Sequence, residues 1–256
     1  MDNNKDIKNE SLAEIAIDPD VLAKELSVEL EIDPLEEIDE DSFSKASLNK
    51  NSECNEALKL LEGNREERIQ GLRIFCEYRD KRSFPLLLPL LDQPCPVERM
   101  SVVYALGRNP CPSAVEKLVS LLKTDDNAYV RRATAWSLAN YDNQIVLEPL
   151  INALKNDVAA VRLWSSSSLA EIGNVSLENA QLAAEQLLVS LKIDNESGVR
   201  SNCIWSLCRL YEKLNITFQE SFVDECTKIA LFDKEPSVME EAKTALDSMG
   251  MQGFYN

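Results

Sequence analysis

Hydrophobic residues recur at helical spacing from about residue 53 onward, in segments that repeat along the chain. Six segments align without gaps on an arginine-like position followed seven residues later by a large apolar one. These pairs are Arg68 and Phe75, Arg99 and Leu106, Arg131 and Leu138, Arg162 and Leu169, Arg200 and Leu207, and Met239 and Leu246. Successive first members, the anchors, stand 31, 32, 31, 38 and 39 residues apart. Self-similarity at such a period is typical of a repeat architecture.

Each anchor segment follows another amphipathic stretch, clearest at residues 115–122, 146–154, 183–191 and 222–231. A short polar turn separates the two stretches, and it carries an acid at Asp92, Asp125, Asp157, Asp194 and Asp233. The pattern predicts six helical hairpins over residues 51–250, followed by a short C-terminal tail, residues 251–256. Because one hairpin cannot bury its apolar face alone, the hairpins are expected to stack into an all-α solenoid with one continuous core.

A valine directly precedes the anchor in the last four units, at Val130, Val161, Val199 and Val238. We expect these valines to fill the seam between hairpins. We expect each anchor arginine to return to the aspartate of its own turn, which would make a ladder of ion pairs along the array. Met239 interrupts that ladder, so the last unit is expected to act as a cap.

Two segments carry a resemblance to a known family. Residues Val130–Leu138 (VRRATAWSL) and Val161–Gly173 (VRLWSSSSLAEIG) resemble the second helix of HEAT repeats. The short period of about 31 residues most resembles the bilin-lyase type, found in the E/F-type phycobilin lyases of cyanobacteria and in many bacterial scaffolds. The resemblance covers about residues 64–249 and implies a HEAT-like α-solenoid.

Composition excludes several kinds of chemistry. The chain has no histidine, which removes Ser-His-Asp triads, Cys-His dyads and His-ligated zinc. No GxGxxG, GxxxxGK or GxSxG motif is present, and the seven cysteines include no CxxC pair. The cysteines are expected to be free thiols, and the serine run at residues 165–168 is expected to permit close helix packing. The sequence therefore indicates no catalytic residue, no metal ligand and, by itself, no cofactor.

The formal net charge is −17, and residues 1–50 hold −10 of it, from 15 acids and 5 bases. This acidic N-terminal segment is expected to be largely disordered. Within it, Leu22, Leu26 and Leu30 fall on one helical face, which is typical of either a transient helix or a short docking motif. The overall charge opposes binding to nucleic acid or to an anionic membrane. With no signal-peptide pattern and no long apolar run, the protein is expected to be cytoplasmic.

The repeat register also indicates which positions the fold does not need. Small residues three, four and six places after each anchor should face the neighbouring helix, whereas places one, two and five should face the concave surface. Aromatic residues occupy such concave places at Tyr104, Trp136, Trp164 and Trp205, with Arg132 beside Trp136. Arg108 and Arg209 follow one turn after Tyr104 and Trp205. These rings would either form a binding groove or pack as ordinary core.

These features favour a non-catalytic adaptor that binds a protein partner through a concave aromatic groove. The proposed contact residues are Tyr104, Arg132, Trp136, Trp164, Trp205 and Arg209. The resemblance implies an alternative from the enzyme class, a phycobilin lyase subunit or a bilin or phycobiliprotein chaperone. In that case the groove would hold a bilin, and a hetero-oligomer would be implied because lyases of this type act as pairs. A further alternative is an adaptor for iron–sulphur cofactor assembly.

Overall fold

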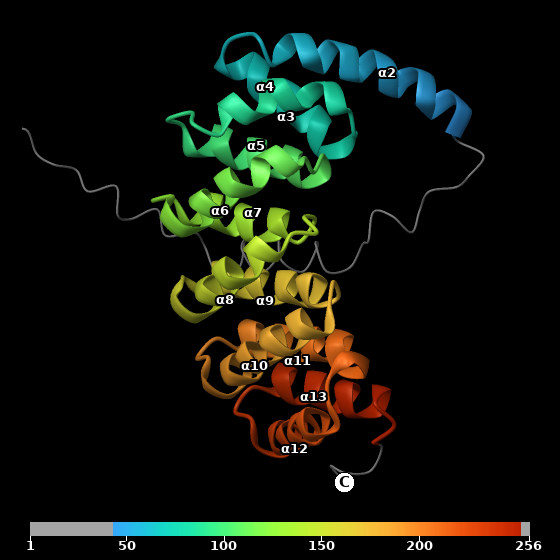
Figure 1. Ribbon diagram of the computed structural model, residues 1–256, viewed down its shortest axis with the longest axis vertical. Helices are drawn as coiled ribbons and strands as arrows, with labels where there is room; N and C mark the ends of the chain where they lie inside the picture. Colours follow the sequence, from blue (N-terminus) through green and yellow to red (C-terminus); the bar gives the residue numbers. More distant parts are fainter. Residues whose placement is uncertain (1–42, 252–256) are drawn as a thin grey trace, which may run out of the picture. The chain divides into compact units, whose positions relative to one another are not determined.

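The computed structural model describes residues 43–251, and it describes side chains from residue 51 onward. Within this part the chain contains twelve α-helices and no strand. The helices pair into six hairpins that stack in chain order (Figure 1). The pairs are α2 (Phe43–Leu60) with α3 (Arg65–Glu77), α4 (Phe84–Leu90) with α5 (Pro96–Arg108), α6 (Val115–Thr124) with α7 (Ala128–Leu138), α8 (Leu147–Asn156) with α9 (Ala159–Gly173), α10 (Leu177–Ile193) with α11 (Ser197–Leu210), and α12 (Ile216–Phe232) with α13 (Pro236–Ser248). The predicted solenoid of six hairpins is confirmed.

The predicted N-terminal tail lies mostly outside the described residues, as does its Leu22–Leu30 face. Residues 252–256 also lie outside them. Helix α2 begins at Phe43, so the last eight residues of the segment expected to be irregular are helical instead. Residues 43–50 contain neither an acid nor a proline, unlike the preceding part of the chain, and nothing in their composition opposes a helix.

The two longer repeat periods have a simple cause. The first helices of the third and fourth hairpins, α6 and α8, have 10 residues each. The corresponding helices of the fifth and sixth hairpins, α10 and α12, have 17 residues each. The added residues lengthen these first helices by about two turns and leave the anchor register unchanged.

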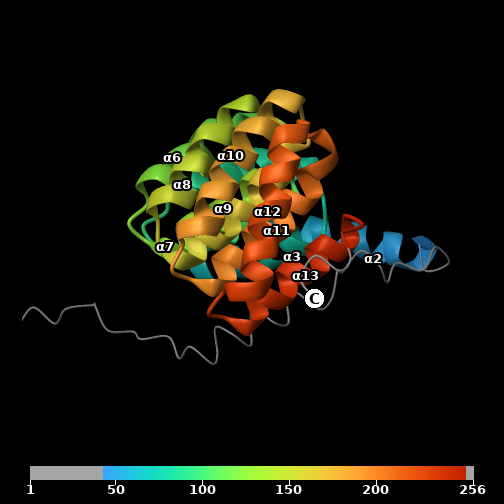
Figure 2. The same ribbon diagram turned by 90° about the horizontal axis from the view of Figure 1, so that it is seen from below.

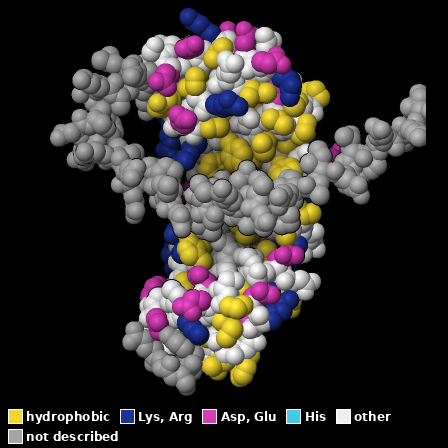
Figure 3. All heavy atoms as spheres, turned by 180° about the vertical axis from the view of Figure 1, so that it is seen from behind, with side chains coloured by type: hydrophobic (Ala, Val, Ile, Leu, Met, Phe, Trp, Pro, Cys, Tyr) yellow, Lys and Arg dark blue, Asp and Glu magenta, His cyan; other side chains and the backbone are white. Residues whose placement is uncertain are grey.

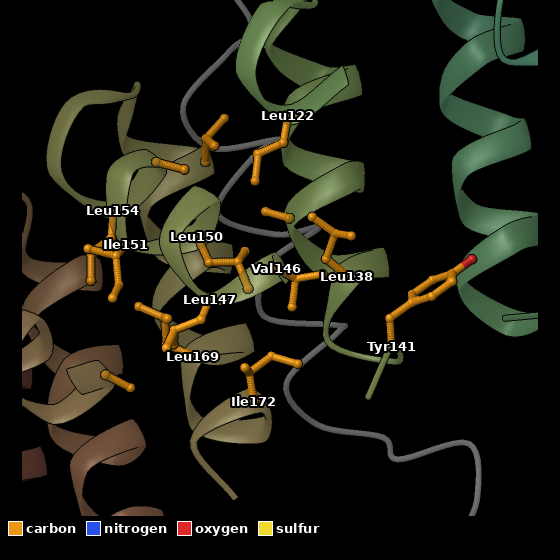
Figure 4. Close-up of a cluster of buried hydrophobic side chains, with 14 of the residues drawn as sticks. Leu122, Leu138, Tyr141, Val146, Leu147, Leu150, Ile151, Leu154, Leu169 and Ile172 are labelled. Carbon is orange, nitrogen blue, oxygen red and sulfur yellow. The ribbon is translucent and has the colours of Figure 1, made fainter. Parts of the chain in front are cut away.

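Aliphatic side chains from neighbouring helices form the core of the array. Leu138 of α7, Leu147 and Leu150 of α8 and Leu169 of α9 converge between the third and fourth hairpins (Figure 4). The valines that precede the anchors, Val130, Val161, Val199 and Val238, are almost fully buried, which confirms that they fill the seams between hairpins. At the edge of this core, the Tyr141 hydroxyl donates to the carbonyl of Leu106 at 3.0 Å, which ties the third hairpin to the second.

The second helices of the hairpins, α3, α5, α7, α9, α11 and α13, pack against one another more extensively than the first helices do. Seen along the stack, α6, α8 and α10 follow one another on one side (Figure 2). Close spacing on one side and wide spacing on the other curve the array, so the second helices line its concave side. None of the described helices is long and apolar enough to cross a membrane.

The expected ion-pair ladder is present, but its connection was predicted wrongly. Four of the five anchor arginines bind the aspartate of the following turn, through Arg99–Asp125, Arg131–Asp157, Arg162–Asp194 and Arg200–Asp233 at 2.7–2.8 Å. Their Nη1 atoms instead donate to backbone carbonyls of their own turns, as Arg131 does to Asp125 at 2.7 Å. The ladder therefore joins successive hairpins, and Met239 ends it because no turn follows.

The first two hairpins depart from the repeat at the seam. In α5 the place of the valine is taken by Glu98, whose side chain is buried, while Val97 is 49% exposed. Glu98 accepts from the Nε of Arg68, so the first anchor arginine pairs with a seam residue. Asp92, the acid of this turn, pairs with Lys117. Because Glu98 occupies the seam position of α5, Val97 stands one place earlier than the valines of the later units.

Candidate functional site

One stripe of positions on each second helix points away from the packed core. Counted from the anchor, these positions are −2, +1, +5 and +9, which lie within about 80° of one another around a helix. On α5 they hold Val97, Met100, Tyr104 and Arg108, and on α7 they hold Tyr129, Arg132, Trp136 and Asn140; all eight are half-buried or exposed. Places three, four and six after the anchors are buried in α5, α7, α9 and α11, as predicted; in α9 they are Ser165, Ser166 and Ser168. In the outer helices, Ile74 of α3 and Lys243 of α13 are only half-buried.

Helices α5 and α7 bring Tyr104, Arg132 and Trp136 together, as the register predicts for neighbouring helices. The Tyr104 and Trp136 rings lie 5.3 Å apart between centroids and are tilted by 55°, a favourable aromatic geometry. The Arg132 Nη2 donates to the Tyr104 hydroxyl at 3.3 Å. The Arg108 guanidinium carbon lies 5.9 Å from the Trp136 ring centroid, and the Arg132 guanidinium carbon lies 5.7 Å from that of Tyr129. We call Tyr104, Arg108, Tyr129, Arg132 and Trp136 the α5–α7 cluster.

Trp205 and Arg209 form a separate pair on α11. The Arg209 guanidinium carbon lies 4.9 Å from the ring centroid of Trp205, which is 40% exposed. Arg209 also binds Glu171 of α9 at 2.7 Å, and both of those side chains are more than two-fifths exposed. Because neighbouring packed helices lie about 8–10 Å apart, this pair stands roughly 20 Å from the α5–α7 cluster along the array.

Trp164 of α9 lies between these two groups in the array. It stands two places after its anchor, and its half-buried ring packs against the hydrophobic core. The equivalent residue of α7, Ala133, is fully buried, so the prediction that place two faces the concave surface is wrong for α7. The six predicted site residues therefore fall into three places on consecutive second helices: Tyr104, Arg132 and Trp136 together, Trp164 partly in the core, and Trp205 with Arg209.

Comparison with known families identifies the architecture. A family model for HEAT repeats matches residues 55–139 and 115–208, which together cover more than half of the chain. The chain belongs to the HEAT-repeat family. The match is to HEAT repeats in general, and the bilin-lyase type stays a prediction. Among curated proteins, no similar sequence was found.

Solved structures share the same fold at low sequence identity. An engineered protein is 21% identical, with a TM-score of 0.52, and the match covers 78% of this chain and 91% of that one. A designed armadillo repeat protein is 19% identical, with a TM-score of 0.54, covering 79% of this chain and all of that one. A second designed armadillo repeat protein, in complex with the peptide (KR)4, is 18% identical, with a TM-score of 0.56, covering 79% and 99%. At this identity the likeness shows the fold alone.

Several side chains on the concave face of this HEAT-repeat array were missed by sequence reasoning. Tyr129, which is 39% exposed, and Met100 belong to the same stripe as Tyr104 and Trp136. The register that placed +1 and +5 on this face also extends to −2 and +9, so the signal was present in the sequence. Seen from behind, the N-terminal part of the array shows hydrophobic side chains at the surface, with both basic and acidic side chains around them (Figure 3).

The cysteines of this HEAT-repeat chain differ in their surroundings. At the half-buried Cys95, hydrogen bonds from the Glu98 backbone N–H and from the Arg65 guanidinium lower the thiol pKa. Cys54, Cys111, Cys203 and Cys226 are buried, and burial raises the pKa of the Cys203 and Cys226 thiols. Burial also raises the pKa of Cys76 to about 11, although Arg108 opposes that shift. Within residues 51–251, no three acidic or cysteine side chains stand close enough to hold a metal ion.

Two shallow hollows lie along the edge of the array formed by the turns within hairpins. One, of about 430 Å³, is lined by Ile193, Phe232 and Lys228 among others, between the C-terminal ends of α10 and α12. The other, of about 340 Å³, lies between α6 and α8. Neither is lined by any of the six predicted residues. The candidate site is therefore an open face, which suits a chain segment better than an enclosed small molecule.

Proposed function

We propose that this HEAT-repeat protein is a non-catalytic scaffold that binds a segment of a partner protein on its concave face. The observation that carries the proposal is the row of rings on consecutive second helices, from Tyr104 and Trp136 through Trp164 to Trp205, with Arg132 and Arg209 beside them. Rings with adjacent guanidinium groups supply large contact area at low entropic cost, as binding hot spots do.

The openness of the face supports a peptide-like ligand. Successive second helices present the same stripe at regular intervals, so a chain running across them would meet equivalent positions in each hairpin. The designed armadillo repeat protein of similar fold is in complex with the peptide (KR)4. The concave face of a helical repeat array of this kind therefore suits an extended peptide, and its side chains decide which one.

The test is affinity capture. The full-length chain serves as bait in extracts of cells that express it, and the captured partner proteins are identified. The Trp136→Ala and Trp205→Ala double variant should keep its far-ultraviolet circular dichroism and lose the partners that the wild type retains. Leu182→Ala is the matched control, since Leu182 is similarly exposed but lies on the first helix α10, away from the concave face. Equal partner recovery by the wild type and the double variant would contradict the proposal.

A tetrapyrrole ligand is a second candidate, which the resemblance to phycobilin lyases implies. It is supported by the guanidinium groups of Arg108 and Arg132, which stand beside aromatic rings and would suit the propionates of a bilin. Co-expression with phycocyanobilin and a phycobiliprotein subunit tests it, because a bilin role predicts bilin absorbance on one of the two proteins. An adaptor role in iron–sulphur assembly stays a prediction, and no cluster-binding residues can be named for it among the described residues.

A further inference from the structure

The charge on the concave face changes along the array. On α5 and α7 the outward stripe holds cationic, aromatic and neutral side chains and no acid. On α3 the stripe carries Arg73 together with two acids, Glu66 and Glu77. On α9 and α11, Glu171 and Arg209 neutralise each other. On α13 the second of the equivalent positions is Glu240, next to Glu241. The acid-free part of the face is thus the α5–α7 cluster.

The two arginines of this cluster differ from the ladder arginines. Every ladder arginine binds a carboxylate, whereas Arg108 and Arg132 bind none among residues 51–251. The Nε of Arg132 is buried and lacks a hydrogen-bond partner within the same residues. Arg132 as a whole is half-buried, and a buried donor without an acceptor has an energetic cost, so this arginine is not fully satisfied within the array.

The two guanidinium groups bracket the aromatic pair. Arg132 stands one helical turn before Trp136, and Arg108 stands one turn after Tyr104. Each contacts the ring of the opposite helix, Arg132 at the Tyr104 hydroxyl and Arg108 beside Trp136. A ligand that places an apolar residue on the rings therefore meets a free cation on either side.

We propose that the α5–α7 cluster binds an acidic linear segment of a partner protein, with an apolar residue on Tyr104 and Trp136 and carboxylates on Arg108 and Arg132. This rests on the proposed function and names the class of partner. The proposal is argued from charge complementarity. On the outward stripe of α5 and α7 the only uncompensated charges are positive, although the whole chain is strongly acidic. That net charge of −17 opposes a nucleic-acid backbone, whereas a short acidic peptide brings few charges to a locally basic site.

The experiment titrates the full-length chain with three fluorescein-labelled peptides, followed by fluorescence anisotropy. The first has glutamates on both sides of a central leucine, and the others replace its glutamates with glutamine or with lysine. The glutamate peptide should bind most tightly, and its affinity should fall as salt is added. Arg108→Gln and Arg132→Gln should each weaken binding about fivefold, as expected for a solvent-accessible ion pair.

Arg79→Gln is the matched control, since Arg79 is exposed, lies after the end of α3 and has no ion-pair partner among the described side chains. Its affinity for the glutamate peptide should equal that of the wild type. An equal loss in Arg79→Gln and in the cluster variants would mean that only net charge matters, and would overturn the proposal. Thermal melts identify any cluster variant that fails to fold, and Arg132→Lys then supplies a charge-retaining comparison.

The outcomes separate this inference from the proposed function. Preferred binding of the lysine peptide or the glutamine peptide overturns the proposal of an acidic partner. If a non-acidic peptide binds and Trp136→Ala abolishes that binding, the concave peptide-binding function survives without the charge preference. Binding of any peptide that Trp136→Ala leaves unchanged would contradict both. Self-association abolished by Arg108→Gln would assign the face to a second copy and overturn the acidic partner.

Discussion

At the residue scale, each anchor arginine uses its donors in two directions. Arg162 Nη1 donates to the Asp157 carbonyl of its own turn at 2.9 Å, while Nε and Nη2 hold the Asp194 carboxylate of the next turn at 2.7 Å. Only a guanidinium presents donors in a planar fork that serves both partners, so lysine would not replace it. The carboxylate also accepts from the backbone N–H of Glu196, which fixes the turn.

The direction of this ladder was misjudged because an aspartate stands five to seven residues before each of the last five anchors, close to the anchor in sequence. In the stacked array the arginine reaches both turns, the carbonyls of its own and the carboxylate of the next. A signal was nevertheless present in the sequence. Asp233 stands in the last turn although Met239 replaces the arginine there, so pairing within one turn would leave Asp233 without a cation. Pairing forward gives it Arg200.

Replacing Asp233 with asparagine tests the ladder. Arg200 and Asp233 side chains are 6% and 10% exposed, so Asp233→Asn would leave a buried guanidinium uncompensated. We expect the free energy of unfolding to fall by about 3–5 kcal/mol, measured by urea denaturation. Glu171→Gln is the control, since its pair with Arg209 is well exposed and should contribute only about 0–1 kcal/mol. Equal urea midpoints for the two variants would count against the ladder.

The same aspartates should make the array sensitive to acid. Burial alone would raise the pKa of Asp194 and Asp233, but hydrogen bonds from Arg162 and Arg200 and from backbone N–H groups lower it overall below the ordinary 3.8. A carboxylate with a lowered folded-state pKa stabilises the fold above its unfolded-state pKa. Its contribution is lost as the pH falls through the folded-state value.

Thermal midpoints measured between pH 7 and pH 3 should therefore separate the wild type from Asp233→Asn by a constant amount well above about pH 4, and the difference should shrink as the pH falls below that value toward the folded-state pKa. Asparagine does not titrate in this range, so the difference between the two proteins isolates this carboxylate from the other acids. A difference that stays constant down to pH 3 would show that Asp233 is not held as the carboxylate by Arg200.

At the element scale, each second helix has an inward and an outward side. The inward side is built from small residues that let helices approach closely, and their hydroxyls bond across the contact: Ser168 donates to the Ala135 carbonyl at 2.8 Å and Ser206 to the Ser166 carbonyl at 2.9 Å. The repeat register predicted this division, because anchor-relative positions recur in every unit. It could not predict that Tyr104 contacts Trp136, since that contact depends on the spacing of two helices.

Gly107 shows how α5 accommodates the ring of the next helix. A Cβ at this position would stand 2.4 Å from Cζ3 of Trp136 and 3.1 Å from the Ser137 hydroxyl. We expect Gly107→Ala to push the half-exposed indole toward solvent and to break its contact with Tyr104. The gain in helix propensity, about 1 kcal/mol, should roughly offset the packing lost.

The readout is tryptophan emission, which should shift to longer wavelength in Gly107→Ala with little change in the urea midpoint. Gly198→Ala is the matched control, because the nearest atom to a Cβ there is Leu163 Cδ1 at an ordinary 3.5 Å. Its emission should match the wild type. An unshifted spectrum in Gly107→Ala would mean that the ring does not depend on this glycine.

At the scale of the whole molecule, each described hairpin contacts chiefly its neighbours, so stability is carried by a row of similar interfaces. The sequence predicted this row from the recurrence of valine, arginine and leucine. The sequence also places most of the negative charge outside the repeats, since residues 1–50 hold more than half of the net charge. Which partner the concave face takes depends on side chains that the repeat does not constrain.

A linear array predicts that the position of a defect decides how the molecule unfolds. Leu169 in α9 and Leu246 in α13 are both fully buried and occupy equivalent positions seven residues after their anchors. Either Leu→Ala change should remove about 2–5 kcal/mol locally. In the central hairpin this loss should uncouple the two halves of the array, whereas in the last hairpin it should only fray one end.

Hydrogen exchange followed by mass spectrometry distinguishes these outcomes. Leu169→Ala should give two unfolding transitions in urea and faster exchange in α7 through α11, because a repeat array loses cooperativity where its weakest interface lies. Leu246→Ala should speed exchange in α12 and α13 and leave α5 and α7 protected as in the wild type. If both variants instead unfolded in one transition with uniform loss of protection, the hairpins would be coupled over the whole array, and a partner bound at α5 and α7 would stabilise α13 as strongly as its immediate neighbours.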